Sequence, residues 1–171
     1  MTNQPTSATS ARFPTEYGQK PEDLNKDLLP WSYVEERLIP ARNYWVSTIT
    51  ASGRPHLRPV DGVWVDGALC FGGSPETRWV RNLERNPAIS VSLPSDEDAI
   101  ILEGTAEQIT DASHPLAALT IAASRQKYPQ YYTEGQDGPP PVPFWAFRPS
   151  RAYAWTLTGF PNKATRFTFD R

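Results

Sequence analysis

The sequence holds few of the residues that build metal centres and disulfide bonds. It has one cysteine, Cys70, and two histidines, His56 and His114, among 171 residues. A single cysteine excludes a disulfide within the chain, and these three residues do not have the spacing of a metal-ligand cluster. We therefore predict no metal site.

Long apolar runs and an excess of one charge are also missing. The sequence nowhere approaches the ~20 apolar residues that span a bilayer, and its first residues lack an apolar signal core. The 17 basic and 19 acidic residues nearly cancel, giving a net charge of −2. This balance disfavours bulk binding to nucleic acids or to anionic membranes. We expect a cytoplasmic protein that acts on a small molecule, with no nucleic-acid and no membrane partner.

The motifs of common hydrolases and NTPases are absent as well. The chain contains no G-x-S-x-G, no G-x-x-x-x-G-K, no H-E-x-x-H and no C-x-x-C pattern. The sequence therefore gives no assignment of catalytic residues.

The length and the 39% hydrophobic content suit a single domain. Residues 1–28 are polar and without periodicity, which predicts a flexible tail or a segment draped over a partner subunit. We expect the single folded domain to cover residues 29–171. A proline run over 139–143 predicts an extended surface loop.

The first half of this domain alternates between strand and helix signals. A short helix is expected over 31–38, with an apolar edge that includes Trp31, Val34 and Leu38. Extended runs over 44–49 and 55–65 predict a hairpin, and the dipeptide at 66–67, Asp-Gly, predicts a tight turn into a third strand over 68–72. Ser74, as N-cap, and Pro75 then predict a helix that runs to about residue 86.

The second half is dominated by strands. Strands are expected over 88–93 and 99–109, a helix over 114–128, and further strands over 144–147, 151–156 and 165–169. Pro149 is expected at an edge or a bulge. Many short antiparallel strands joined by hairpins favour a barrel, because closure removes exposed sheet edges. The predicted fold class is mainly β with flanking helices.

Three segments carry a resemblance to a known group of proteins. They are GRPHLRPV at 53–60, DGALCFGGS at 66–74 and TRWVRNL at 77–83. With these segments the sequence resembles the pyridoxamine-5'-phosphate-oxidase-like split β-barrel superfamily, which includes the flavin- and deazaflavin-dependent oxidoreductases. The resemblance runs from about residue 44 to 102 and continues weakly through 144–166. It implies an antiparallel FMN-binding split barrel and a homodimer with two cofactor sites at the subunit interface.

The resemblance also implies the cofactor and its contacts. The cofactor is FMN or the deazaflavin coenzyme F420, with a lean toward the deazaflavin. The residues given cofactor roles are Arg58, Pro59, Val60, Ser74, Thr77, Arg78, Trp79, Asn82 and Arg166. The first three would follow the ring system, and the segment 74–78 would offer helix N-terminal N–H groups and a guanidinium to a phosphate. Arg166 would reach the cofactor across the dimer.

Trp79 departs from the family pattern. Many relatives carry a phosphate-binding lysine at this position, and an indole cannot replace it. Trp79 would instead stack on a ring or fill space as a packing residue. Plain alternatives stand beside the other assignments too: an ordinary helix start at 74–77, a solvated Arg58 and an exposed edge residue at Arg166.

Three functions follow from the resemblance. The first is an oxidoreductase that transfers a hydride between a bound flavin or deazaflavin and a small organic substrate. The second is a non-catalytic carrier or sensor that binds a flavin, a deazaflavin or haem, for which only His56 and His114 are candidate axial histidines. The third, pyridoxamine-phosphate oxidation, is disfavoured because the arginine-rich C-terminal signature of those enzymes is not visible.

Overall fold

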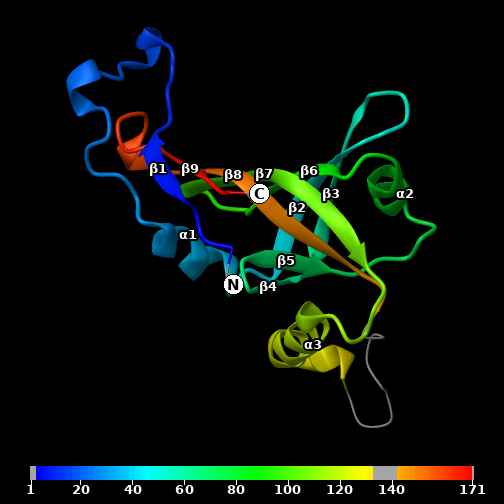
Figure 1. The fold of residues 1–171 in the computed structure, drawn as a ribbon. Coiled ribbons are helices and arrows are strands. Elements are labelled where there is room, and N and C mark those ends of the chain that lie inside the picture. The colour runs from blue at the N-terminus through cyan, green and yellow to red at the C-terminus, as the bar shows by residue number, and fades with distance from the viewer. Residues whose placement is uncertain (1–2, 133–141, 171) are drawn as a thin grey trace.

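The protein is built on one antiparallel sheet flanked by helices (Figure 1). The computed structural model describes residues 3–132 and 142–170. Within them the α-helices are α1 (Trp31–Leu38), α2 (Arg78–Arg85) and α3 (Pro115–Lys127). The strands are β1 (Ser7–Ser10), β2 (Asn43–Ile49), β3 (Pro55–Asp61), β4 (Val63–Val65), β5 (Ala68–Phe71), β6 (Ala88–Ser92), β7 (Asp98–Ile109), β8 (Phe144–Thr156) and β9 (Thr165–Thr168).

The sheet curves around the core without closing. The hydrogen-bonded order is β1-β9-β8-β7-β6-β2-β3, while β5 pairs with β8, and β4 pairs with β5. β3 and β4 follow each other in the chain but pair with different strands, so the sheet stays open between them. This arrangement confirms the predicted mainly β, antiparallel split barrel.

Gly62 separates β3 from β4, where one continuous strand was predicted over 55–65. A side chain here would come within 3.0 Å of the Cys70 carbonyl oxygen and of Leu69 Cδ1. The Tyr128 hydroxyl bonds to the backbone of Gly62, at 3.0 Å from its nitrogen and 2.9 Å from its oxygen. The single long strand was a wrong prediction because the break is fixed by these contacts in space, not by a turn signal in the sequence.

The hairpin predictions are confirmed. β2 and β3 pair along their whole length around a turn at Gly53, which has a φ of 77°. Asp66 and Gly67 connect β4 to β5 with φ values of 48° and 68°. Positive φ at both central residues is the requirement of the tightest hairpin turn, which Asp-Gly meets at low steric cost.

The inward-facing residues of the strands form the main core. Tyr44, Val46, Leu102 and Phe147 are fully buried within it. The apolar edge of α1 packs on the same core through Trp31, Val34 and Leu38. A second cluster lies between α3 and the β4-β5 hairpin, which places α3 against this part of the sheet (Figure 1).

The N-terminal segment differs from the expectation of a segment without structure. Residues 7–10 form β1, which pairs with β9 over four residues at the edge of the sheet (Figure 1). The Ser10 N–H donates to Asn25 Oδ1 at 2.9 Å, and the Asn25 N–H donates to Ser10 Oγ at 2.7 Å. This strand has no apolar periodicity to reveal it, because backbone pairing at an edge strand does not need an apolar face.

Two further boundaries differ from the predictions. α2 begins at Arg78, because the Ser74 hydroxyl accepts from the Glu76 N–H (3.3 Å) and holds this segment as a turn. The two strands predicted over 144–147 and 151–156 are one strand, β8, with a register shift opposite Glu103 and Gly104. Pro149 lies at this irregularity, as expected. Most of the proline run, residues 139–141, lies outside the described residues.

Candidate functional site

A pocket of about 780 Å³ lies among β3, the end of β5, the start of α2, and α3. Its walls are mostly apolar, with a few polar groups, which is the usual character of a small-molecule site. The residues that line it are Pro59, Val60, Asp61, Gly62, Val63, Cys70, Phe71, Gly72, Gly73, Pro75, Trp79, Thr120, Ile121, Ser124, Tyr128, Tyr131, Tyr132, Pro143 and Phe144.

The indole of Trp79 forms one wall of this pocket. It is 7% exposed and packs on Phe71 with ring centroids 5.4 Å apart. Its edge lies against Gly73, where a Cβ would come within 2.0 Å of Trp79 Cζ2. Gly73 therefore lets the edge of the indole approach the backbone that follows β5, which gives the pocket a fixed aromatic surface.

Pro59 and Val60 form the neighbouring wall. Both belong to β3, where Pro59 pairs with Trp45 and Val60 with Tyr44 of β2. Val60 is buried, whereas Pro59 is exposed. The structure thus brings three of the predicted cofactor residues, Pro59, Val60 and Trp79, together in one pocket.

Arg58 and Arg78 adjoin this wall without lining the pocket. Each precedes a lining residue in the chain, and both side chains are exposed. Burial lowers the pKa of His56, and the positive charges of Arg58 and Arg78 lower it further. Neither arginine is in an ion pair with a described residue. Two unpaired arginines around one histidine form a local positive site beside α2.

Ser74 and Thr77 are exposed or half-buried residues of the turn before α2. Thr77 is the N-cap residue but makes no capping hydrogen bond, since its hydroxyl donates to the Ser74 carbonyl oxygen at 2.7 Å. The first N–H groups of a helix have no partner within the helix, so this end of α2 points donors outward next to the positive site.

Asn82 and Arg166 lie apart from the pocket within one chain. Asn82 is buried, and its Nδ2 donates to Thr48 Oγ1 at 2.9 Å, which ties α2 to β2. Arg166 is exposed on β9, where it pairs with Tyr153 and Thr9 at the opposite edge of the sheet from β3. Its role across a dimer stays a prediction.

A polar cluster on the α3 side of the pocket was not predicted. Asp61 accepts hydrogen bonds from Tyr131 Oη at 2.6 Å and from Asn43 Nδ2 at 2.8 Å. The hydrogen bond to Asp61 and its negative charge raise the pKa of Tyr131. Tyr128 stacks on Tyr131 with centroids 5.7 Å apart. The sequence offered one signal, the three tyrosines at 128, 131 and 132, but nothing local connects them to residue 61.

Lys127 secures the end of α3 beside this cluster. Its ammonium group donates to the carbonyl oxygens of Ala41 (2.8 Å) and Gly62 (3.2 Å) and to Tyr44 Oη (3.2 Å). Burial and the nearby Arg42 lower the pKa of Lys127 to about 8. The lysine thus holds α3 to the segment before β2 and to the break between β3 and β4.

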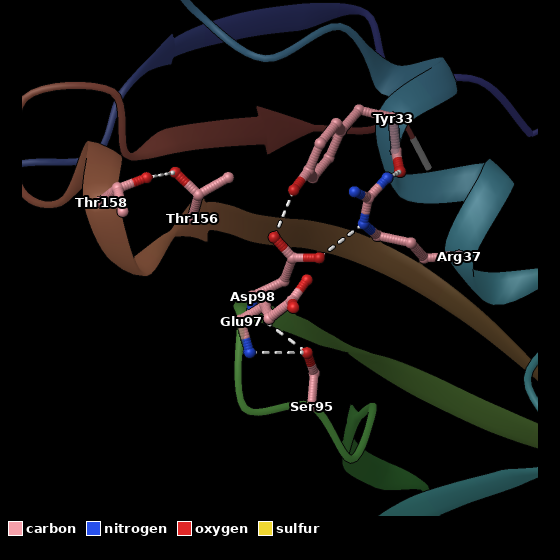
Figure 2. Close-up of polar contacts among 7 residues, drawn as sticks. All are labelled: Tyr33, Arg37, Ser95, Glu97, Asp98, Thr156 and Thr158. Carbon is pink, nitrogen blue, oxygen red and sulfur yellow. Dashed lines mark hydrogen bonds and ion pairs between the residues drawn. The ribbon is translucent and has the colours of Figure 1, made fainter.

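A second pocket of about 490 Å³ lies between α1 and the β6-β7 turn. Next to it, Asp98 accepts hydrogen bonds from Tyr33 Oη and from Arg37 Nε, the latter at 2.6 Å (Figure 2). Arg37 also lies over the Tyr33 ring at 3.4 Å and donates to the Tyr33 carbonyl oxygen. Because each group is satisfied by the others, we interpret this network as the anchor of α1 on β7.

Residues 3–132 and 142–170 contain neither a metal-ligand cluster nor a helix that could span a membrane. No three His, Cys, Asp or Glu side chains there are placed to hold a metal ion. No helix of this part of the chain has the length and apolar character to cross a bilayer.

The pyridoxamine 5'-phosphate oxidase family model matches residues 34–156. The chain belongs to this family. The match spans the sheet from α1 to the end of β8 and so contains both walls of the pocket. No curated protein matches the chain.

Solved structures of other proteins share the fold of this chain. A haem binding protein from Mycobacterium smegmatis has a TM-score of 0.61 and 23% identity, over 82% of this chain and 59% of its own. A putative 5-nitroimidazole antibiotic resistance protein from Bacteroides thetaiotaomicron also has a TM-score of 0.61, with 14% identity over 84% and 89% of the two chains. A pyridoxamine 5'-phosphate oxidase-related, FMN binding protein from Nostoc punctiforme has a TM-score of 0.52 and 21% identity, over 81% and 89%. The chain thus spans about three fifths of the mycobacterial protein and most of the other two.

Proposed function

We propose that this member of the pyridoxamine 5'-phosphate oxidase family is an oxidoreductase that uses FMN or the deazaflavin coenzyme F420. One observation carries the proposal: the aromatic and apolar wall of Pro59, Val60 and Trp79 lies directly beside the unpaired arginines Arg58 and Arg78. Such a cofactor has a planar aromatic ring and an anionic tail, so it needs both features in adjacent places.

The pocket fits the ring of such a cofactor. Its volume of about 780 Å³ lies within the range of small-molecule sites. The Trp79 indole is fixed by Gly73 and Phe71, so it presents a flat surface at little cost in conformational entropy. Trp79, in place of the lysine of many relatives, would contact the ring and not the phosphate.

The positive site beside α2 fits the phosphate. Arg58 and Arg78 would each donate charge-assisted hydrogen bonds, and the start of α2 would add backbone N–H donors. This division of roles makes up for the family lysine that the chain lacks. We keep Ser74 and Thr77 as further donors in this proposal, since both lie on the same turn.

The cofactor supplies the hydride chemistry when it is bound. The chain's own residues orient the ring, exclude water from its face and bind the substrate on the α3 side of the pocket. No residue is assigned as acid or base. The lean toward the deazaflavin coenzyme rests on the sequence resemblance and on the altered position 79.

A homodimer is part of this proposal. The outer face of the β2-β3 hairpin carries the exposed residues Ile49, Pro55, Leu57 and Pro59 beside the half-buried Trp45, and Leu57 is 51% exposed. A row of exposed apolar side chains on two strands marks a surface for a partner. A second copy of the chain would cover it next to the pocket, and could bring its Arg166 to the cofactor.

A second candidate function is that of a non-catalytic carrier. It is suggested by the structural similarity to the haem binding protein of Mycobacterium smegmatis. The described histidines give haem little support. His56 does not line the pocket and lies beside two arginines, and the ring nitrogen Nδ1 of His114 accepts from the Leu116 N–H as the cap of α3.

The test is a redox assay of the loaded protein. Protein loaded with FMN or with the deazaflavin coenzyme is offered a broad panel of electron donors and acceptors, and cofactor reduction is followed by absorbance. We expect turnover with at least one pair of electron donor and acceptor. Tight binding without turnover over the whole panel would instead establish the carrier, and a parallel haem titration would identify that ligand.

A further inference from the structure

The α3 side of the pocket holds one charged side chain. Among the described residues that line the pocket, Asp61 alone carries a charge, and the polar groups around it are the hydroxyls of Thr120, Ser124 and the three tyrosines. The arginines that fit an anion lie on the other side, beside α2. The two sides of the pocket therefore differ in the charge that they accept.

Asp61 is held in a fixed position. Asn43 donates to Oδ1 at 2.8 Å and Tyr131 donates to Oδ2 at 2.6 Å, so each carboxylate oxygen has one partner and retains capacity to accept a second hydrogen bond. Both partners are neutral at pH 7, because an amide carries no charge and a phenol is protonated well above this pH. The carboxylate thus keeps its full charge while its orientation is set.

The nearest cations do not neutralise Asp61. Arg42 lies over the Tyr128 ring at 5.7 Å and donates to the Lys127 carbonyl oxygen, and Lys127 donates to backbone oxygens and to Tyr44. No described residue forms an ion pair with Asp61. The carboxylate is therefore free to pair with a ligand.

We propose that Asp61 selects for a substrate with a positively charged or N–H-donating group, such as a protonated amine attached to a planar ring. The ring of Tyr131 lines the same side of the pocket and would add cation-π attraction, whereas the Tyr132 ring already has Arg125 over it at 5.5 Å. An anionic substrate, such as a carboxylate or a phosphate ester, would be repelled by Asp61. This inference rests on the proposed function only in naming the ligand of the α3 side as the substrate.

The experiment measures binding of three small probes of similar shape and different charge: benzylamine, benzyl alcohol and benzoate. At pH 7 the first is a cation, the second neutral and the third an anion. Each is titrated into the full-length protein by NMR, first without cofactor and then with FMN or the deazaflavin coenzyme present. We expect benzylamine to bind about ten-fold more tightly than benzoate, with benzyl alcohol in between.

Two variants assign the preference to Asp61. Asp61→Asn keeps the shape and removes the charge, and we expect it to bring the three dissociation constants close to one another. Asp96→Asn is the matched control, because Asp96 is exposed in the β6-β7 turn and does not line the pocket. It should keep the full wild-type preference. Equal binding of the three probes to wild-type protein, or an unchanged preference in Asp61→Asn, would overturn the inference.

The experiment distinguishes failure of this inference from failure of the proposed function. If the probe preference is present and neither cofactor binds, the oxidoreductase is lost but the charge selection by Asp61 stands. If a cofactor binds and no probe preference exists, the selection is lost and the oxidoreductase stands. Should Asp61→Asn fail to fold, the preference of the wild-type protein alone decides the inference.

Discussion

The close approach of Gly73 to Trp79 allows a sharp test of the pocket wall. In Gly73→Ala the new methyl group would meet Trp79 Cζ2 at 2.0 Å and Cη2 at 2.6 Å. Carbon atoms prefer separations of about 3.5–4.0 Å, so the indole must move by about 1.5 Å. Because the indole packs on Phe71 on one side, the way open to it is into the pocket that it lines, where it would disturb the cofactor wall.

Overpacking of this kind costs about 1–3 kcal/mol, which lowers the melting temperature of a chain of this size by about 2–12 °C. The displaced indole would also weaken flavin binding. A loss of about 1.4 kcal/mol of binding free energy raises the dissociation constant about ten-fold. The assays are thermal unfolding of the cofactor-free protein by circular dichroism, and fluorescence titration with the cofactor.

Gly72→Ala is the matched control. No heavy atom lies within 4 Å of a Cβ at Gly72, and neither glycine has a positive φ. Both substitutions restrict the unfolded chain to a similar degree, so their difference isolates the contact with Trp79. The double variant Gly73→Ala/Trp79→Leu should be more stable than the sum of the two single changes predicts. If Gly73→Ala melts at the same temperature as Gly72→Ala, the described wall is wrong.

Three further predictions concern other parts of the molecule. Asp98→Asn should lower the free energy of unfolding by about 1.5–3 kcal/mol through weaker hydrogen bonds from Tyr33 and Arg37. Burial raises the pKa of Asp98, but these two hydrogen bonds outweigh it and leave the pKa below its ordinary value. The stabilisation is therefore fully present above pH ~4 and is lost as the pH falls through the lowered folded-state pKa, so urea unfolding should show a smaller wild-type advantage at pH 3 than at pH 7. Arg78→Ala should weaken cofactor binding by about 1.5–3 kcal/mol, and an unchanged dissociation constant would remove Arg78 from the phosphate site. Light scattering should give a mass near twice the 19.2 kDa chain, and Leu57→Asp should shift it toward the monomer, whereas a monomeric wild type would contradict the proposed dimer.

The sequence predicted those parts of the fold that local patterns encode. The aromatic and β-branched residues at 44–49, and the Asp-Gly turn at 66–67, located strands and hairpins correctly. The short helix before β2 was also found, because its apolar residues repeat at helical spacing between two prolines. These signals depend on neighbours in the chain, which the sequence displays directly.

The missed features depend on contacts between distant segments. β1 forms because the edge of β9 offers backbone partners, and the break at Gly62 depends on Tyr128, which lies 66 residues away. The start of α2 was misplaced because the Ser74 hydroxyl favours a local turn over a helix cap.

The residues of the candidate site were likewise predicted from the sequence only in part. The family resemblance located Pro59, Val60 and Trp79, which the structure brings to one pocket. It could not locate Asp61 and Tyr131, because their hydrogen bond joins residues 70 positions apart and is not part of the motif. The packing of Trp79 on Gly73 could be seen only in the structure. The sequence left two roles for Trp79, stacking on a cofactor ring or filling space as a packing residue.

We propose that the pocket binds a flavin-type cofactor through the Trp79 wall and the arginines beside α2. The most direct measurement is a parallel fluorescence titration of cofactor-free protein with FMN and with the deazaflavin coenzyme, followed both by ligand fluorescence and by quenching of tryptophan emission. We expect saturable binding of one of them at micromolar concentration or tighter, with one site per chain. Absence of saturable binding for both cofactors would contradict it.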